Sequence, residues 1–174
     1  DLAQPFRTLA HNGEINTLKG NINWMKIHEQ DMSSSLFKNV KDLQPVIRSS
    51  SDSGALDNVF ELLVHSGKLA PLIKLMMIPD AWSKRSKTVP KNHQDLFNFL
   101  NSTIEPWDGP AAICATDAKW VLASSDRNGL RPLRYTLTSD DLFFAGSETG
   151  MIKIPEENII EKGKLGPGQI IAID

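Results

Sequence analysis

The spacing of apolar residues along the chain changes near residue 109. Before that point apolar residues recur at intervals of three and four, as in Leu56, Val59, Phe60 and Leu63, and this spacing predicts amphipathic helices. The predicted helices cover residues 15–32, 56–64, 69–77 and 93–104. Beyond that point, alternation and short apolar runs predict strands. The predicted strands cover residues 111–115, 120–124, 133–137, 142–145, 159–160 and 169–173.

The connections between these segments define the expected architecture. The turns after the first strands are short, as at residues 117–118, 127–129 and 139–141, and short connections favour antiparallel neighbours. No linker separates the helical part from the β part. We therefore expect an α+β fold in which helices pack on an antiparallel sheet, as one domain over residues 1–174.

Composition narrows the class of protein. The chain has 174 residues, with 40% hydrophobic and 23% charged residues, which is typical of a globular protein. A net charge of −2 gives no basic footprint for nucleic acid or an anionic membrane. No apolar run approaches the roughly 20 residues that span a bilayer, and no signal peptide is visible. The single cysteine excludes an internal disulfide and a cysteine zinc cluster. These features fit a cytoplasmic or plastid-stromal protein.

The segment around residues 11–18, His-Asn-Gly-Glu-Ile-Asn-Thr-Leu, carries the first candidate chemistry. An extended run at residues 6–10 precedes an Asn-Gly pair, which predicts a sharp turn, and a helix capped by Asn16 or Thr17 follows. Exposed backbone N–H groups and the amide of Asn12 could stabilise an oxyanion. From this segment alone, a plain connection from strand to helix is the favoured interpretation.

Asp52 lies in a serine-rich turn before a predicted helix. A carboxylate there is favoured by capping and by the helix dipole. A structural role of this kind is the simpler hypothesis. The functional alternative is a carboxylate at the edge of a pocket that binds a substrate ammonium group.

Three arginines, Arg127, Arg131 and Arg134, fall within one connection between strands. They could bind phosphate or carboxylate, although a solvated turn with structural ion pairs is the simpler interpretation. Cys114 lies inside an apolar strand and is expected to be inert. The four histidines are scattered without the spacing of metal ligands, and we expect structural or surface roles for them.

Five segments, in this order along the chain, resemble one family. They are residues 6–17 with their continuation to 21, and residues 50–53, 109–112, 125–132 and 161–168. They are similar to the glutaminase domain of the glutamate synthases, within the class II glutamine amidotransferases. An isolated Asn-Gly-Glu would be weak support, but five segments in order are specific. The resemblance covers nearly the whole chain, and residues 38–48 and 82–91 are its least distinctive parts.

The resemblance implies a fold and a reaction. The implied fold is the N-terminal-nucleophile hydrolase fold, an α-β-β-α sandwich of antiparallel sheets, here N-terminally truncated. In this family an N-terminal cysteine thiol attacks the side-chain amide of L-glutamine, its free α-amino group acts as the base, and ammonia leaves through an internal channel. Asn12 and Gly13 match the oxyanion hole, through the side-chain amide and the backbone N–H. Asp52 matches the aspartate that binds the α-ammonium group.

The chain departs from the family at its first residue. Asp1 stands where a nucleophilic cysteine would be expected in a complete domain. The family's arginine for the glutamine α-carboxylate would lie upstream of Asp1. We therefore expect residues 1–174 to be the C-terminal part of the glutaminase domain and to be inactive when isolated. Missing N-terminal strands would leave sheet edges unpaired.

The resemblance also implies partners outside this chain. Glutamate synthases convert glutamine, 2-oxoglutarate and two electrons into two glutamates. FMN and an iron–sulfur cluster are expected in other domains, with NAD(P)H or ferredoxin as the electron donor, and no cofactor or metal is expected within this chain. Two rival functions remain: another class II amidotransferase, of the phosphoribosyl or asparagine-forming type, and a non-catalytic anion-binding module that uses the three arginines. The long insertion between residues 52 and 109 argues against the first.

Overall fold

The computed structural model describes residues 6–48, 51–85 and 87–174. The helices are α1 (Leu18–Asp31), α2 (Asp52–His65), α3 (Ala70–Met77) and α4 (Lys91–Asn101). Short 3-10 helices lie at Val40–Leu43, Trp82–Arg85 and Glu156–Asn158. The strands are β1 (Leu9–Gly13), β2 (Ala111–Thr116), β3 (Val121–Ser125), β4 (Arg134–Thr138), β5 (Phe143–Gly146), β6 (Ile159–Lys164) and β7 (Ile170–Ile173).

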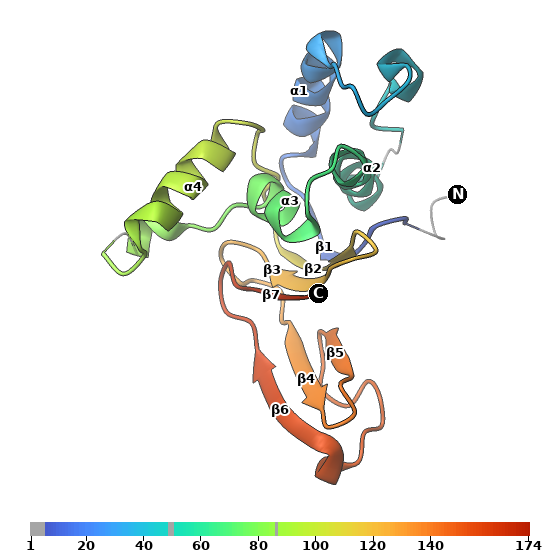
Figure 1. Ribbon diagram of the computed structural model, residues 1–174. Helices are drawn as coiled ribbons and strands as arrows, with labels where there is room; N and C mark the ends of the chain where they lie inside the picture. Colours follow the sequence, from blue (N-terminus) through green and yellow to red (C-terminus); the bar gives the residue numbers. More distant parts are fainter. Residues whose placement is uncertain (1–5, 49–50, 86) are drawn as a thin grey trace.

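The strands form two antiparallel sheets. The first has the order β1-β2-β3-β7, and the second has the order β5-β4-β6. The four helices lie on one side of the first sheet, and the second sheet extends away from its other side (Figure 1). The predicted α+β fold with antiparallel strands is confirmed. The described residues supply one helical layer and two sheets.

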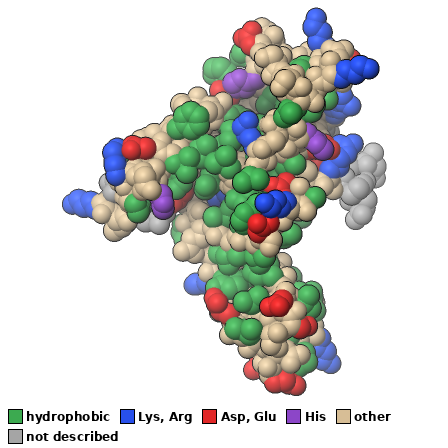
Figure 2. Space-filling model, viewed as in Figure 1, with side chains coloured by type: hydrophobic (Ala, Val, Ile, Leu, Met, Phe, Trp, Pro, Cys, Tyr) green, Lys and Arg blue, Asp and Glu red, His purple; other side chains and the backbone are tan. Residues whose placement is uncertain are grey.

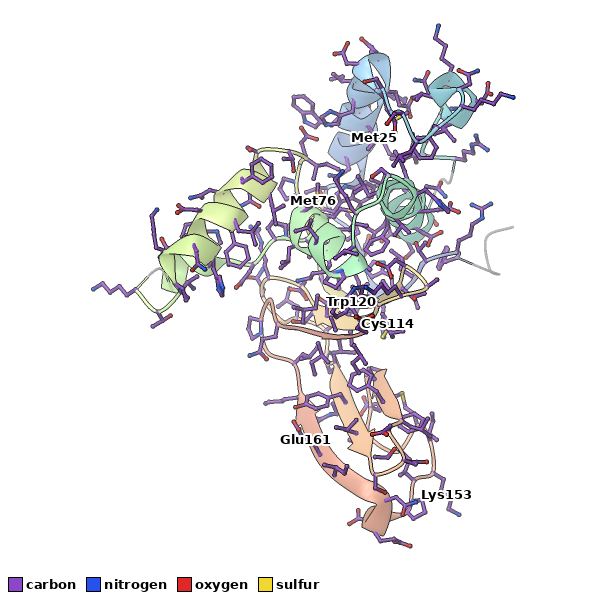
Figure 3. The ribbon with its side chains drawn as sticks, viewed as in Figure 1. Met25, Met76, Cys114, Trp120, Lys153 and Glu161 are labelled. Carbon is purple, nitrogen blue, oxygen red and sulfur yellow. The ribbon has the colours of Figure 1, made fainter. Side chains whose placement is uncertain are left out.

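The main hydrophobic core fills the space between the helices and the first sheet. All four helices contribute to it, with Met25 of α1 and Met76 of α3 pointing inward, and so do β1, β2 and β3 (Figure 3). Alternate residues of β2 face opposite ways, as the pleat requires: Ile113 belongs to this core. Ala112 belongs to a smaller cluster with Ala123 and Leu133, which joins the two sheets.

Sequence periodicity placed the four α-helices and the strands β2 to β7, but the first strand runs over Leu9–Gly13 and not over residues 6–10. The Asn-Gly pair does not form a turn, because Asn12 and Gly13 are the last residues of β1. Residue spacing alone predicted one sheet, whereas the resemblance implied two, and two are present. β3 pairs with β7 and β4 pairs with β6, so the 126–133 connection crosses between the sheets. In α4 only Leu100 of the predicted apolar face is buried, and Phe99 beside it is 64% exposed.

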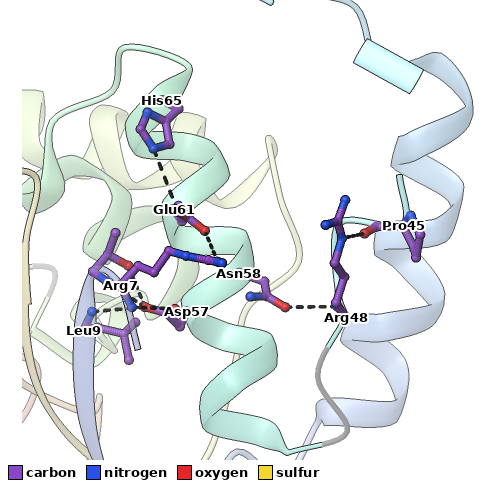
Figure 4. A network of polar contacts seen from close by, with 9 residues as sticks. Arg7, Leu9, Pro45, Arg48, Asp57, Asn58, Glu61 and His65 are labelled. Atoms are coloured by element: carbon purple, nitrogen blue, oxygen red, sulfur yellow. Dashed lines mark hydrogen bonds and ion pairs between the residues drawn. The ribbon is translucent and has the colours of Figure 1, made fainter. Parts of the chain in front are cut away.

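A buried carboxylate fastens β1 to the helical layer. Asp57 of α2 is 2% exposed and accepts hydrogen bonds from the backbone amides of Arg7 (3.0 Å), Thr8 (2.9 Å) and Leu9 (3.1 Å). It also accepts from the hydroxyl of Thr8 at 2.8 Å. Figure 4 shows these contacts beside the ion pair of Arg7 with Glu61 (3.0 Å) on the same helix. No local sequence pattern indicates this role of Asp57.

Candidate functional site

Three of the family-like segments meet at one end of the first sheet. Residues 11–17 end β1, residues 109–112 begin β2, and residues 125–132 follow β3. The ladder places Gly13 opposite Ala111 and Ala112 opposite Ser125. Segments that are about 100 residues apart in sequence therefore form one continuous strip of backbone.

The strand ladder leaves the N–H of Gly13 pointing out of the sheet. Gly13 lies opposite Ala111, and the next residue, Glu14, donates its amide to the carbonyl of Pro110 at 2.9 Å. Hydrogen-bonded and non-hydrogen-bonded pairs alternate along an antiparallel ladder, so Gly13 and Ala111 form a non-hydrogen-bonded pair. Among the described strands β1 is at the edge of its sheet. The Gly13 amide therefore faces away from β2, where a ligand could approach it.

Two outward amides on this edge, one in β1 and one just beyond its end, are occupied by carboxylates from α2. Leu9 N–H donates to Asp57, and Ile15 N–H donates to Oδ2 of Asp52 at 2.8 Å. Between them lie the outward amides of His11 and Gly13, and neither makes a hydrogen bond within the part of the chain that the structure describes. An outward, unused N–H beside an exposed Asn side chain is the arrangement of donors that an oxyanion requires.

Two glycines allow the end of β1 to approach the start of β2 closely. A Cβ at Gly13, where φ is +150°, would lie 1.8 Å from the carbonyl oxygen of Pro110. A Cβ at Gly109, where φ is +155°, would lie 2.0 Å from the carbonyl oxygen of Glu14. Any side chain at either position would push the two strands apart. Gly13 therefore serves this contact and not the turn that its Asn-Gly context predicted.

Asp52 is the first residue of α2. The N-cap is Ser51, whose hydroxyl accepts from the amide of Gly54 at 3.1 Å, so Asp52 is a first-turn acid and not the cap itself. Its Oδ2 is anchored by the Ile15 amide, two residues beyond Gly13. No hydrogen bond to its Oδ1 is made by the described residues. Residue 50, the first of the family-like segment 50–53, lies outside the described part of the chain, as do residue 49 and Asp1.

His11 connects the site strand to the same helix. Its Nδ1 lies 2.8 Å from the hydroxyl of Ser53, and its Nε2 is buried without a hydrogen-bond partner among the described residues. Burial lowers the pKa of the ring below its ordinary value, the Asp52 carboxylate and the Pro110 carbonyl oppose this, and the Arg131 guanidinium adds to it. The lowered pKa favours the neutral form of the ring. A structural or surface role was predicted for His11, which lies in β1 with its ring against Ser53 of α2.

Asp126 organises the third segment. It is 1% exposed, and its Oδ1 accepts from the amides of Ala111 (3.0 Å) and Leu130 (3.1 Å). Its Oδ2 accepts from Asn128 (2.9 Å), and its own amide donates to the carbonyl of Ala111 (2.8 Å). This carboxylate thus builds the turn after β3 and ties it to the start of β2. Asp126 was not among the predicted site residues, because no local sequence pattern distinguishes it from an ordinary turn aspartate.

The remaining candidate residues, Cys114 and two of the arginines, lie where a structural role explains them. Cys114 lies in β2, as predicted, where burial raises the pKa of its thiol, so it is not activated as a nucleophile (Figure 3). Arg127 forms an ion pair with Asp108 at 2.5 Å. Arg134 begins β4, next to a cavity of the second sheet that Glu148 also lines.

The described residues hold neither a metal-binding cluster nor a helix that could cross a membrane. No group of three or more His, Cys, Asp or Glu side chains there could hold a metal ion. None of the helices in that part of the chain has the length and the apolar run that a bilayer crossing requires.

Comparisons with known proteins agree on one family. The family model for class II glutamine amidotransferases matches residues 1–174. The large chain of an NADPH glutamate synthase from Azospirillum brasilense is 58% identical over 175 residues, covering 99% of this chain and 12% of that protein. A ferredoxin-dependent glutamate synthase from Antithamnion sp. is 44% identical, covering 99% of this chain and 12% of that protein.

Among solved structures, the chain is similar to a glutamine phosphoribosylpyrophosphate amidotransferase from B. subtilis. The identity is 20%, the TM-score is 0.47, and the match covers 95% of this chain and 26% of that chain. This likeness is too loose to carry an argument. The sequence relatives are much longer than this chain, which spans about an eighth of their length. On the match over its whole length, the chain belongs to the class II glutamine amidotransferases.

Proposed function

We propose that residues 1–174 form the C-terminal part of a glutaminase domain of glutamate synthase. Together with the preceding residues of that protein, they would make up a single structural domain. The observation that carries this is the outward N–H of Gly13, beside the exposed side chain of Asn12, at the end of β1. Family membership and relatives named as glutamate synthases support it.

Each site residue has one role in this proposal. The Gly13 N–H and the Asn12 amide donate to the oxyanion that forms when the glutamine side-chain amide is attacked. Asp52 binds the α-ammonium group through the oxygen that Ile15 does not occupy. The anchored oxygen fixes the carboxylate, so that the free one is held in place before glutamine arrives.

The nucleophile in this proposal comes from outside residues 1–174. The single thiol of the chain, Cys114, is in a strand, and burial raises its pKa. A cysteine from a preceding segment, with an arginine for the α-carboxylate, would complete the site. Ammonia would then be used elsewhere in the longer protein, where FMN, an iron–sulfur cluster and electrons from NAD(P)H or ferredoxin serve the synthesis of glutamate from 2-oxoglutarate.

The proposal is tested in the full-length protein that contains this chain. Asn12→Ala should lower kcat for glutamine hydrolysis about 100-fold with little change in KM, because an oxyanion donor acts mainly in the transition state. Asp52→Asn should mainly raise KM. The matched control is Asn98→Ala on the exposed face of α4, which should leave both constants unchanged.

Two results would contradict the proposal. One is a full-length protein that does not hydrolyse glutamine. The other is an Asn12→Ala variant with unchanged kcat. Purified residues 1–174 should be inactive on glutamine, and measurable turnover by that fragment would overturn the assignment of the nucleophile to an outside segment.

The anion-binding alternative has less support. Arg127 is already paired with Asp108, and Arg134 lies in a strand of the second sheet. An anion site built from all three arginines would have to break that pair.

A further inference from the structure

A half-exposed ion pair bridges the two loops that flank the end of β1. Nη2 of Arg127 donates to Oδ2 of Asp108 at 2.5 Å, with 47% of the arginine side chain and 34% of the aspartate side chain exposed. Arg127 lies in the turn after β3, and Asp108 lies in the loop before β2. The two residues are 19 positions apart in sequence, so their contact is set by the fold.

The backbone of Asp108 holds the residues that follow the site strand. Its carbonyl accepts from the amide of Asn16 at 2.7 Å, and its amide donates to the hydroxyl of Thr17 at 3.0 Å. Together with the bond from Glu14 to Pro110 at 2.9 Å, these contacts clamp residues 14–17 against residues 108–110. Gly13 directly precedes the residues that these contacts hold.

The other half of the ion pair stands on a rigid base. Asp126, directly before Arg127, is buried and exchanges two hydrogen bonds with the backbone of Ala111. The carbonyl of Asp126 also accepts from the amides of Gly129 (3.0 Å) and Gly168 (2.8 Å). Arg127 therefore extends from a fixed turn toward a loop that has no secondary structure of its own.

The ion pair of Arg127 and Asp108 is expected to contribute little to folding stability, which favours a positioning role. An exposed ion pair contributes little to folding stability, because water screens the charges and two long side chains must be ordered. Loss of this pair should therefore leave the fold intact. It should still loosen the position of Asp108 within the 108–110 loop, and a shift of about 1 Å in a catalytic group can cost up to about 100-fold in rate.

We infer that Asp108 and Arg127 are positioning residues that hold the Gly13 amide in the geometry of the oxyanion hole. The inference rests on the proposed function of Gly13 as an oxyanion donor. Neither side chain touches substrate. Arg127 fixes Asp108, Asp108 fixes residues 16 and 17, and these residues fix the direction of the outward N–H of Gly13.

The test measures kinetics and hydrogen exchange in the full-length protein. Asp108→Asn and Arg127→Met should each lower kcat for glutamine hydrolysis about tenfold, with KM within twofold of the wild-type value. The double variant should be no worse than either single variant, because both changes remove the same contact. The control is Lys91→Met, which breaks the exposed pair of Lys91 and Asp95 on α4 (2.7 Å) and should change nothing.

Amide exchange separates this inference from the proposed function. In Arg127→Met, exchange in a peptide covering residues 13–18 should speed up at least threefold, while exchange in α2 is unchanged. Unchanged exchange in residues 13–18 would overturn the inference whether or not the protein hydrolyses glutamine. A wild-type protein without glutaminase activity would overturn the proposed function even if exchange responds. If Asp108→Asn lowers the melting temperature of the protein as well as kcat, the pair has a merely structural role and the inference is overturned.

Discussion

Lys74 is a single residue whose burial has a measurable consequence. It lies on α3 with 1% of its surface exposed, and its Nζ lies 3.5 Å from the carbonyl oxygen of Gly168. Burial lowers its pKa to about 8, against the opposing pull of the Asp80 and Asp126 carboxylates. The two carboxylates partly stabilise the buried ammonium group, but they do not restore the ordinary pKa of the lysine.

This burial predicts how stability depends on pH. The unfolded chain binds the lysine proton up to about pH 10.4, whereas the folded chain releases it near pH 8. Between those values the unfolded state holds more protons, so the free energy of unfolding rises with pH, by about 3 kcal/mol for this group. Below pH 8 the contribution is constant.

Urea unfolding at pH 7, 9 and 10.5 measures this effect. Between pH 8 and pH 10.5, the free energy of unfolding of the wild type should rise relative to that of Lys74→Met. The exposed Lys26→Met on α1 serves as the control and should show no such change. A difference for Lys74→Met that stays flat from pH 7 to 10.5 would show that the lysine titrates normally in the folded chain.

At the scale of elements, the joint between α2 and β1 depends on one carboxylate. Asp57→Ala would leave the amides of Arg7, Thr8 and Leu9 without their acceptor next to the core. Unsatisfied buried donors are costly, so we expect a loss of about 3 kcal/mol in the free energy of unfolding.

The neighbouring residue provides the comparison for Asp57. Asn58→Ala removes the bond from the amide of Arg48 (2.9 Å) at an exposed position (Figure 4), and should cost less than about 1 kcal/mol. Both losses are read from chemical denaturation of residues 1–174. Equal losses in the two variants would contradict the assigned role of Asp57.

Elements could be predicted from sequence more fully than their joints. Periodicity placed α2 and the strands β2 to β7 because each depends on local spacing of apolar residues. Sequence spacing could not predict that residues 126–133 lead from the first sheet to the second, since the pairing of β3 with β7 is set by contacts distant in sequence. In the candidate site, the resemblance supplied Asn12, Gly13 and Asp52. Asp108 and Asp126 could not be found, because their partners come from other segments.

For the whole molecule, the apolar interior is divided unequally. The large core lies between the helices and the first sheet, and the joint to the second sheet consists of Ala112, Ala123 and Leu133 with partly buried neighbours. Figure 2 shows the second sheet projecting below the body, with acidic and basic side chains toward its far end. Its strands have residues such as Ile160 (64% exposed) on an open face. Local stability follows buried apolar contact, so this sheet should open before the body.

Two probes on residues 1–174 separate these parts. All four tryptophans, at positions 24, 82, 107 and 120, precede the second sheet, and their fluorescence reports unfolding of the body. Proteolysis within residues 139–160 reports opening of the second sheet. We expect cleavage there to rise at urea concentrations that leave tryptophan fluorescence native. Leu133→Ala should widen this gap by weakening the joint, whereas Leu122→Ala, in the main core, should narrow it by lowering the midpoint of the body. Coincident transitions in all three proteins would mean that the two sheets unfold as one cooperative unit.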